Sequence, residues 1–116
     1  MATNESNRPV AKWVVMWNLP ADTDIEQWET WYWEQHVPLA QRMPHQIRYV
    51  TSKTVRRAYG AGYYRIAEQY FPTVDLLEEA IASPAGVAVA EDAGPFVTDL
   101  QLLVTIETEV SLDCEG

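Results

Sequence analysis

The first regular stretch of the chain has alternating hydrophobic positions. The segment from Val10 to Asn18 reads as a β-strand, because successive side chains of a strand point to opposite faces. Both alternating sets are apolar, with Trp13, Val15 and Trp17 on one face and Val14 and Met16 on the other. A strand that is apolar on both faces is covered on both faces, so the pattern predicts a central strand of a sheet.

A stripe of rings at helical spacing follows this strand. Its members recur every three or four residues, and they are Ile25, Trp28, Tyr32, His36 and Leu39. The spacing predicts a helix from about Ile25 to Met43. Pro38 lacks a backbone N–H, so we expect this helix to kink or break near His36. Indole and phenol groups need hydrogen-bond partners when buried, so the stripe suits the wall of a pocket for a flat organic molecule.

The remaining pattern completes a six-element domain. It predicts strands from His45 to Ala58, Tyr63 to Phe71 and Leu100 to Val110, and helices from Thr73 to Ala82 and Pro84 to Ala93. The order is β-α-β-β-α-β, which predicts a ferredoxin-like α+β fold with a four-stranded antiparallel sheet and its helices on one face. We expect the domain to span 10–110, between tails at 1–9 and 111–116. The bare sheet face predicts a two-fold homodimer.

Composition narrows the class of protein. The chain has 116 residues, which is one domain, and 17 acidic against 8 basic residues give a net charge of −9. Nucleic acids and anionic membranes attract basic proteins, so neither is an expected partner. The single cysteine, Cys114, excludes an internal disulfide and favours a cytoplasmic location. We find neither a signal peptide nor an apolar run long enough for a membrane helix.

Three residues are candidates for catalysis. His36 titrates near neutral pH and could act as a general base or acid, although a packed histidine at a helix kink would look the same. Glu68 lies mid-strand among rings, where it could carry a proton or orient His36; the alternative is an ion pair with an arginine of the sheet. The Tyr64 hydroxyl could assist by stabilising an enolate.

A larger aromatic set is predicted to bind substrate. It comprises Trp13, Trp17, Trp28, Tyr32, Trp33, Tyr49 and Tyr70. Each ring taken singly is better explained by core packing, but together they predict an aromatic cavity. The two histidines, His36 and His45, lie apart from any cluster of ligands, so no metal site is expected. No glycine-rich phosphate loop is present, and we expect no cofactor.

Four segments, in order, resemble the EthD-like domain of the dimeric α+β barrel superfamily. They are WEQHVP at 33–38, RYV at 48–50, IAEQYF at 66–71 and EDAGPF at 91–96. The resemblance implies a homodimer with a cavity between sheet and helices in each subunit. Superfamily members include cofactor-free monooxygenases, polyketide cyclases, lactone isomerases, decarboxylases and dehydratases, and others bind haem.

The hypothesis that follows is a cofactor-independent lyase, isomerase or cyclase that acts on a hydrophobic oxygenated ring or a polyketide-like compound. His36 would move the proton, with Glu68 or a tyrosine assisting. One alternative is a cofactor-free monooxygenase, in which tryptophans shield the activated substrate from water. Others are a haem protein that uses His36 or His45 as axial ligand, and a non-enzymatic accessory protein that binds a metabolite.

Overall fold

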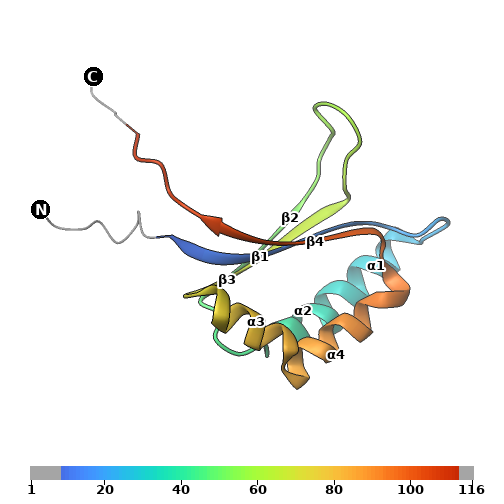
Figure 1. Ribbon diagram of the computed structural model, residues 1–116. Helices are drawn as coiled ribbons and strands as arrows, with labels where there is room; N and C mark the ends of the chain where they lie inside the picture. The colour runs from blue at the N-terminus through green and yellow to red at the C-terminus, as the bar shows by residue number, and fades with distance from the viewer. Residues whose placement is uncertain (1–8, 113–116) are drawn as a thin grey trace, which may run out of the picture.

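A computed structural model of the protein describes residues 9–112 and contains one four-stranded antiparallel sheet (Figure 1). The strands are β1 (Val10–Asn18), β2 (Arg48–Lys53), β3 (Arg65–Phe71) and β4 (Thr98–Glu107). Their order across the sheet is β2-β3-β1-β4. This order confirms that the first strand is central and places β2 at one edge.

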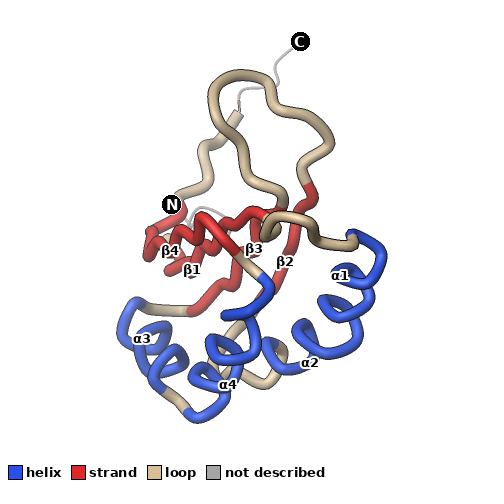
Figure 2. The backbone as a smooth tube through the Cα atoms, turned by 90° about the vertical axis from the view of Figure 1, so that its right-hand side faces the viewer, coloured by secondary structure: helices blue, strands red, loops and turns tan. Residues whose placement is uncertain are grey.

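All the helices pack on one face of this sheet (Figure 2). They are α1 (Ile25–Trp31), the π-helical segment η2 (Tyr32–His36), α2 (Val37–Ala40), α3 (Val74–Ala82), α4 (Pro84–Ala93) and the 3-10 segment η3 (Gly94–Phe96). The arrangement confirms the predicted ferredoxin-like fold. The predicted tails lie largely outside the described residues, as does Cys114. Within residues 9–112, the helices are too short or too polar to cross a membrane.

The observed strands differ from the predicted ranges, most of all at the second strand. The second was expected from His45 to Ala58, but β2 covers only Arg48–Lys53. His45 has a φ of 69°, which lies in the left-handed region and is incompatible with a strand. After β2, the chain forms a connection that projects away from the helices and is exposed at residues 54–61 (Figure 1). The β-forming residue Val55 is 96% exposed and Tyr59 is 95% exposed, so neither reflects burial in the sheet.

Two buried clusters hold the helices on the sheet. One joins β1, β3 and α3 with the loop after α2, through Ala11, Met43, Phe71, Leu77 and Ala80. The other joins β1 and β3 to α1 and η2 through Trp17, Trp28, Tyr32 and Ala67. Side-chain caps fix where helices begin, since Thr73 Oγ1 accepts from the Leu76 N–H at 3.1 Å and Ser83 Oγ from the Gly86 N–H at 3.1 Å.

The break expected near His36 takes the form of a π turn. Pro38 has no N–H to continue the α-helical pattern, and the Val37 N–H bonds to the Tyr32 carbonyl five residues earlier. Such wide turns inside helices are frequent at functional sites. Here the turn ends on His36.

Gly86 is the residue that lets α3 and α4 meet closely. A Cβ added there would lie well inside van der Waals contact of the backbone carbonyls of Ala80 and Ile81. We expect Gly86→Ala to lower the free energy of unfolding by about 1–3 kcal/mol, because overpacked backbone must shift. Urea denaturation measures the change. Gly94→Ala is the matched control, since nothing lies within 4 Å of its added Cβ; equal losses in both variants would contradict the packing argument.

Candidate active site

An apolar cavity of about 160 Å³ lies between the sheet and the helices. We call it the inner cavity. Its sheet wall is formed by Trp13, Val15 and Trp17 of β1 and by Tyr49 of β2, and its helix wall includes His36 and Val89. The face of the first strand that carries Trp13 therefore lines the cavity. This places Trp13, Trp17, Tyr49 and His36 around one space.

His36 forms a pair with Asp92 of α4. The two groups join through His36 Nδ1 and Asp92 Oδ2, which lie 3.0 Å apart, and their side chains are only 12% and 11% exposed. Asp92 also accepts a hydrogen bond from Gln35 Nε2 at 2.6 Å. A carboxylate beside Nδ1 favours the tautomer that carries its proton there, which leaves Nε2 as an acceptor. The pair thus has the form of a general base with its orienting carboxylate.

Rings hold the imidazole in place. It stacks on Tyr32 with ring centroids 5.7 Å apart and lies 5.0 Å from the Trp31 ring. Burial lowers the pKa of His36 below its ordinary value, and Asp92 only partly offsets this effect. The imidazole is therefore neutral at pH 7 and able to accept a proton.

This pKa predicts a pH dependence of stability. Below about pH 6.5, His36 of the unfolded chain binds a proton that the folded site resists, so the free energy of unfolding falls as pH drops toward the lowered folded pKa. Above about pH 6.5 the group contributes no pH dependence. Urea denaturation at about pH 5.5 and 7.5 measures the fall.

The control for this prediction is His36→Gln, which removes the titrating group. We expect a smaller loss of stability on acidification in this variant than in the parent chain. Equal losses in the two chains would contradict the assignment to His36.

Tyr49 also lines the inner cavity, where Gln69 is a further polar residue of the wall. Burial, together with the neighbouring Tyr32 hydroxyl, raises the pKa of Tyr49, so its hydroxyl stays protonated and can donate a hydrogen bond. Tyr32 itself shares a hydrogen bond with Thr51 Oγ1 at 2.8 Å. A base and a protonated phenol therefore lie at one apolar space.

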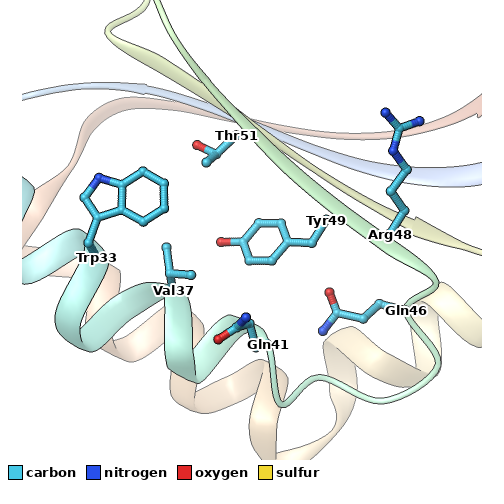
Figure 3. Close-up of a pocket in the computed structure, with 7 residues that line it drawn as sticks. All are labelled: Trp33, Val37, Gln41, Gln46, Arg48, Tyr49 and Thr51. Atoms are coloured by element: carbon cyan, nitrogen blue, oxygen red, sulfur yellow. The ribbon is translucent and has the colours of Figure 1, made fainter.

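A second depression lies outside the inner cavity, along the open edge of β2. This outer groove has a volume of about 420 Å³ and is lined by Trp33, Val37, Gln41, Gln46, Arg48, Tyr49 and Thr51 (Figure 3). Figure 3 shows Tyr49 projecting from β2 toward Val37. Tyr49 lines both spaces, so the outer groove adjoins the inner cavity at this residue.

Trp33 belongs to the outer groove and not to the inner cavity. Its side chain points outward and is 50% exposed. The ring is nonetheless held, because its Nε1–H donates to Glu29 Oε1 at 3.1 Å. Trp28 also lies apart from the inner cavity: it is buried in the core, where its Nε1–H donates to the Phe96 carbonyl at 2.7 Å.

Glu68 does not orient His36, and this prediction is wrong. Ala67 and Gln69 line the inner cavity, so Glu68 between them faces the opposite side of the sheet. There it pairs with Lys12 Nζ at 2.8 Å, and not with any arginine within residues 9–112. Tyr70 shares that far face, where its hydroxyl donates to Glu107 Oε1 at 2.9 Å, so it does not line the cavity either.

Tyr64 is also separate from the His36 pair. Tyr64 lies before the first residue of β3. The alternation of side chains within β3 therefore does not decide which face of the sheet Tyr64 shares with Glu68 or with Ala67. Its hydroxyl donates to Glu29, and its ring meets Trp28 edge-on with centroids 5.4 Å apart. Burial, followed by this hydrogen bond to Glu29, raises the pKa of Tyr64 to about 12. The arrangement favours a structural role.

Asp92 is the site residue that the sequence analysis missed. It lies 56 positions from His36 along the chain, and acidic residues are common on helix surfaces. The available signal was its place within EDAGPF at 91–96, one of the segments that carried the resemblance. Among residues 9–112, no cluster of three or more His, Cys, Asp or Glu side chains is arranged to hold a metal ion.

Comparisons with known proteins agree with this architecture. A model of the EthD domain matches residues 21–99. An EthD family protein from Bacillus halodurans is 24% identical, with a TM-score of 0.72, and the match covers 87% of this chain and 99% of that one. A protein of Bacteroides fragilis, described as dimeric with a ferredoxin-like fold, is 13% identical over 83% of this chain and 94% of that one, with a TM-score of 0.64.

A hydroxynitrile lyase from Passiflora edulis has a similar fold as well. It is 16% identical, with a TM-score of 0.69 and coverage of 89% of this chain and 97% of that one. No curated protein matches the chain. At these identities, the structural likeness establishes the fold alone.

Proposed function

Because this chain belongs to the EthD family, we propose that it is a cofactor-independent lyase, isomerase or cyclase whose general base is His36. One observation carries the proposal: the buried His36–Asp92 pair lies at the wall of an apolar cavity. A neutral imidazole oriented by a carboxylate is suited to abstract a proton. The lyase with a similar fold supports this class of chemistry without specifying a reaction.

The cavity suggests the size and kind of substrate. A volume of about 160 Å³ is close to that of a cavity that binds benzene, so the part of the substrate beside His36 is one hydrophobic ring with an oxygen function. A porphyrin is several times larger, so the cavity disfavours the haem alternative. Polyketide-like compounds with a single ring remain within the proposed class.

The proposed step is proton transfer from a carbon next to a carbonyl group. His36 Nε2 accepts the proton, and the electron pair of the C–H bond becomes an enolate. Asp92 stabilises the imidazolium that forms, and the protonated Tyr49 hydroxyl donates to the enolate oxygen. In an elimination, the enolate expels a leaving group on the next carbon, which takes the proton from His36. In an isomerisation, His36 returns the proton to another carbon; in a cyclisation, the enolate carbon bonds to a second carbonyl carbon, whose oxygen takes the proton.

Deuterium exchange tests this step without knowledge of the product. Small cyclic ketones and hydroxylated aromatic ketones are incubated with the protein in D₂O, and NMR follows loss of the proton next to the carbonyl. We expect enzyme-dependent exchange that His36→Gln abolishes. No exchange above the buffer rate across the panel, or exchange that persists in the variant, would contradict the proposal. Oxygen uptake during the same incubation would favour the monooxygenase alternative.

We also propose a homodimer in the cytoplasm. The far face of the sheet carries Val14, Met16 and Leu103 next to polar residues, and a dimer would cover it. The Bacteroides fragilis protein described as dimeric supports the same state. Sedimentation of the purified chain tests the oligomeric state directly.

A further inference from the structure

Gln69 is a polar residue of the inner cavity that the proposed proton transfer does not use. It is only 5% exposed, and it lines the cavity from within β3. In the register of the sheet, it lies opposite Trp13 of β1 on one side and opposite Tyr49 of β2 on the other. Side chains of paired residues share a face and lie close together. An indole ring, an amide and a phenol therefore form one row across the sheet wall of the cavity.

The hydrogen bonds of Gln69 fix which way its amide points. Its Nε2 donates to the Ala40 carbonyl at 3.2 Å and to Gln46 Oε1 at 3.1 Å, and it lies 3.6 Å from Met43 Sδ. These neighbours are all acceptors, so the flipped amide would set its oxygen against them. Gln46 is itself held, because its Nε2 donates to the carbonyls of Ala40 and Met43 at 2.8 and 3.0 Å. The amide nitrogen of Gln69 is therefore directed at the end of α2 and the loop that follows it.

The amide oxygen of Gln69 points elsewhere. Among residues 9–112, no side chain or backbone group donates to its Oε1. Four side-chain atoms of these residues are both enclosed and unpaired, and this oxygen is not one of them, so it keeps some exposed surface. Gln69 lines the inner cavity and not the outer groove, so that surface faces the inner cavity. Buried polar atoms are nearly always hydrogen-bonded, and a molecule in the cavity is the partner that this oxygen can have.

The polar groups of the cavity together describe the ligand that suits it. The Tyr49 hydroxyl donates, whereas His36 Nε2 and Gln69 Oε1 accept. An amide oxygen cannot bind a ketone oxygen or a carboxylate, since these are acceptors as well, and it requires an O–H or N–H group. A charged amine is costly to bury without a carboxylate to pair with it, and the residues that line the inner cavity include no Asp or Glu. A neutral hydroxyl group fits both conditions.

We propose that Gln69 Oε1 binds substrate by accepting a hydrogen bond from a hydroxyl group on the substrate ring. The substrate is then a hydroxylated ring ketone, whose carbonyl oxygen accepts from Tyr49 and whose hydroxyl donates to Gln69. This substrate class rests on the proposed function, whereas the preference of the cavity for a hydroxyl group does not. An analogue without the hydroxyl leaves the amide oxygen unpaired, and sites that bind a substrate hydroxyl in this way reject such analogues.

Two pairs of probes of equal size measure this preference. The first pair is meta-hydroxyacetophenone and meta-methylacetophenone, and the para isomers form the second pair. Within each pair, a methyl group replaces the hydroxyl. NMR titration gives the dissociation constants for the parent chain and for Gln69→Met, which keeps the length of the side chain but removes the amide. For at least one pair, we expect the hydroxyl-to-methyl affinity ratio to be about tenfold higher in the parent than in Gln69→Met.

Gln41→Met is the matched control, because Gln41 lines the outer groove and not the inner cavity. Its affinity ratios should equal those of the parent chain. Gln69→Met also loses the bonds of Nε2, so circular dichroism checks that it folds. If it does not, the side-chain amide carbon of Gln69 in the parent chain takes its place as the readout. Its NMR signal should move downfield with a hydroxyl probe and not with the matching methyl probe.

Three results would overturn the proposal: equal affinity ratios in the parent and Gln69→Met for both pairs, an amide carbon signal that does not respond to the hydroxyl probes, or a parent chain that binds none of the probes. None of these readouts requires turnover. Deuterium exchange without a preference for the hydroxyl would remove this inference and leave the proposed function standing. A preference without exchange would remove the proposed function and leave Gln69 as a binding group.

Discussion

Replacing His36 with glutamine is expected to lower turnover on the proposed substrates by about 10²–10⁴-fold, the usual contribution of a positioned general base. Glutamine keeps a polar side chain of similar reach but cannot accept a proton at neutral pH. The imidazole packs between rings and bonds to Asp92 at 3.0 Å, so some stability will also be lost. Steady-state kinetics of folded protein, checked by circular dichroism, separates the two effects.

The chain contains its own control in His45, the other of its two histidines. His45 bonds to Glu79 at 2.8 Å on an exposed surface and does not line the inner cavity. We expect His45→Gln to keep turnover within about twofold of the parent, because surface substitutions rarely disturb a distant site. Full turnover in His36→Gln would exclude this residue as the base. Equal losses in both variants would point to a general effect of histidine replacement.

Asp92→Asn should reduce turnover as well, because asparagine neither stabilises an imidazolium nor fixes the tautomer of His36. It should also lower the pKa of His36 further, since Asp92 is the group that raises it against burial. NMR titration of the imidazole measures this second effect independently of activity. A pKa that rises in Asp92→Asn would contradict the pairing.

The largest expected loss of stability follows from Phe71→Ala. Phe71 is completely buried, and it packs with Leu77, Ala80 and Met43 where α3 meets the sheet. Removing a buried phenylalanine side chain costs about 3–5 kcal/mol, through lost burial and the cavity left behind. Small domains have about 5–15 kcal/mol of total stability, so this variant loses a large share of it.

Chemical denaturation measures this loss, with Val87→Ala as a control. Val87 is 48% exposed, and its truncation should change the free energy of unfolding by less than about 0.5 kcal/mol. Phe71→Leu should lie between the two, because leucine fills part of the space. A loss below about 1 kcal/mol in Phe71→Ala would mean that this core relaxes around the cavity.

The fold could be predicted because its signals are local. Two-sided apolar alternation placed β1 at the centre of the sheet, and the spacing of apolar residues predicted the helices α3 and α4. Boundaries were less accurate at the second strand, since β-forming residues within 54–58 lie in an exposed connection where no partner strand fixes them. Pro38 predicted a break, but the choice of a π turn depends on which carbonyl the Val37 N–H reaches.

The candidate site was harder to predict because it depends on which face of each strand lines the cavity and on residues that are far apart in the sequence. Glu68 was considered as a partner of His36, but it lies on the other face of the sheet. Side chains of a strand alternate between the two faces, and the sequence does not say which face lines a cavity. Trp13 and Trp17 line the inner cavity, but both faces of β1 are apolar, so its sequence left open which face lines a cavity. The pairing of Asp92 with His36 depends on the packing of α4 against η2, which pattern alone does not specify.

The π turn of η2 makes the side chain presented at the site depend on the number of residues in this segment. A turn in which Val37 bonds to the Tyr32 carbonyl holds one residue more than an α-helical turn. A chain shorter by one residue here could close into a regular helix and keep the residues on both sides in phase. It would fold as this chain does, yet present a different side chain where the imidazole now lies. Within one fold, the deletion of a single codon could therefore distinguish chains that carry a general base from chains that only bind a small molecule.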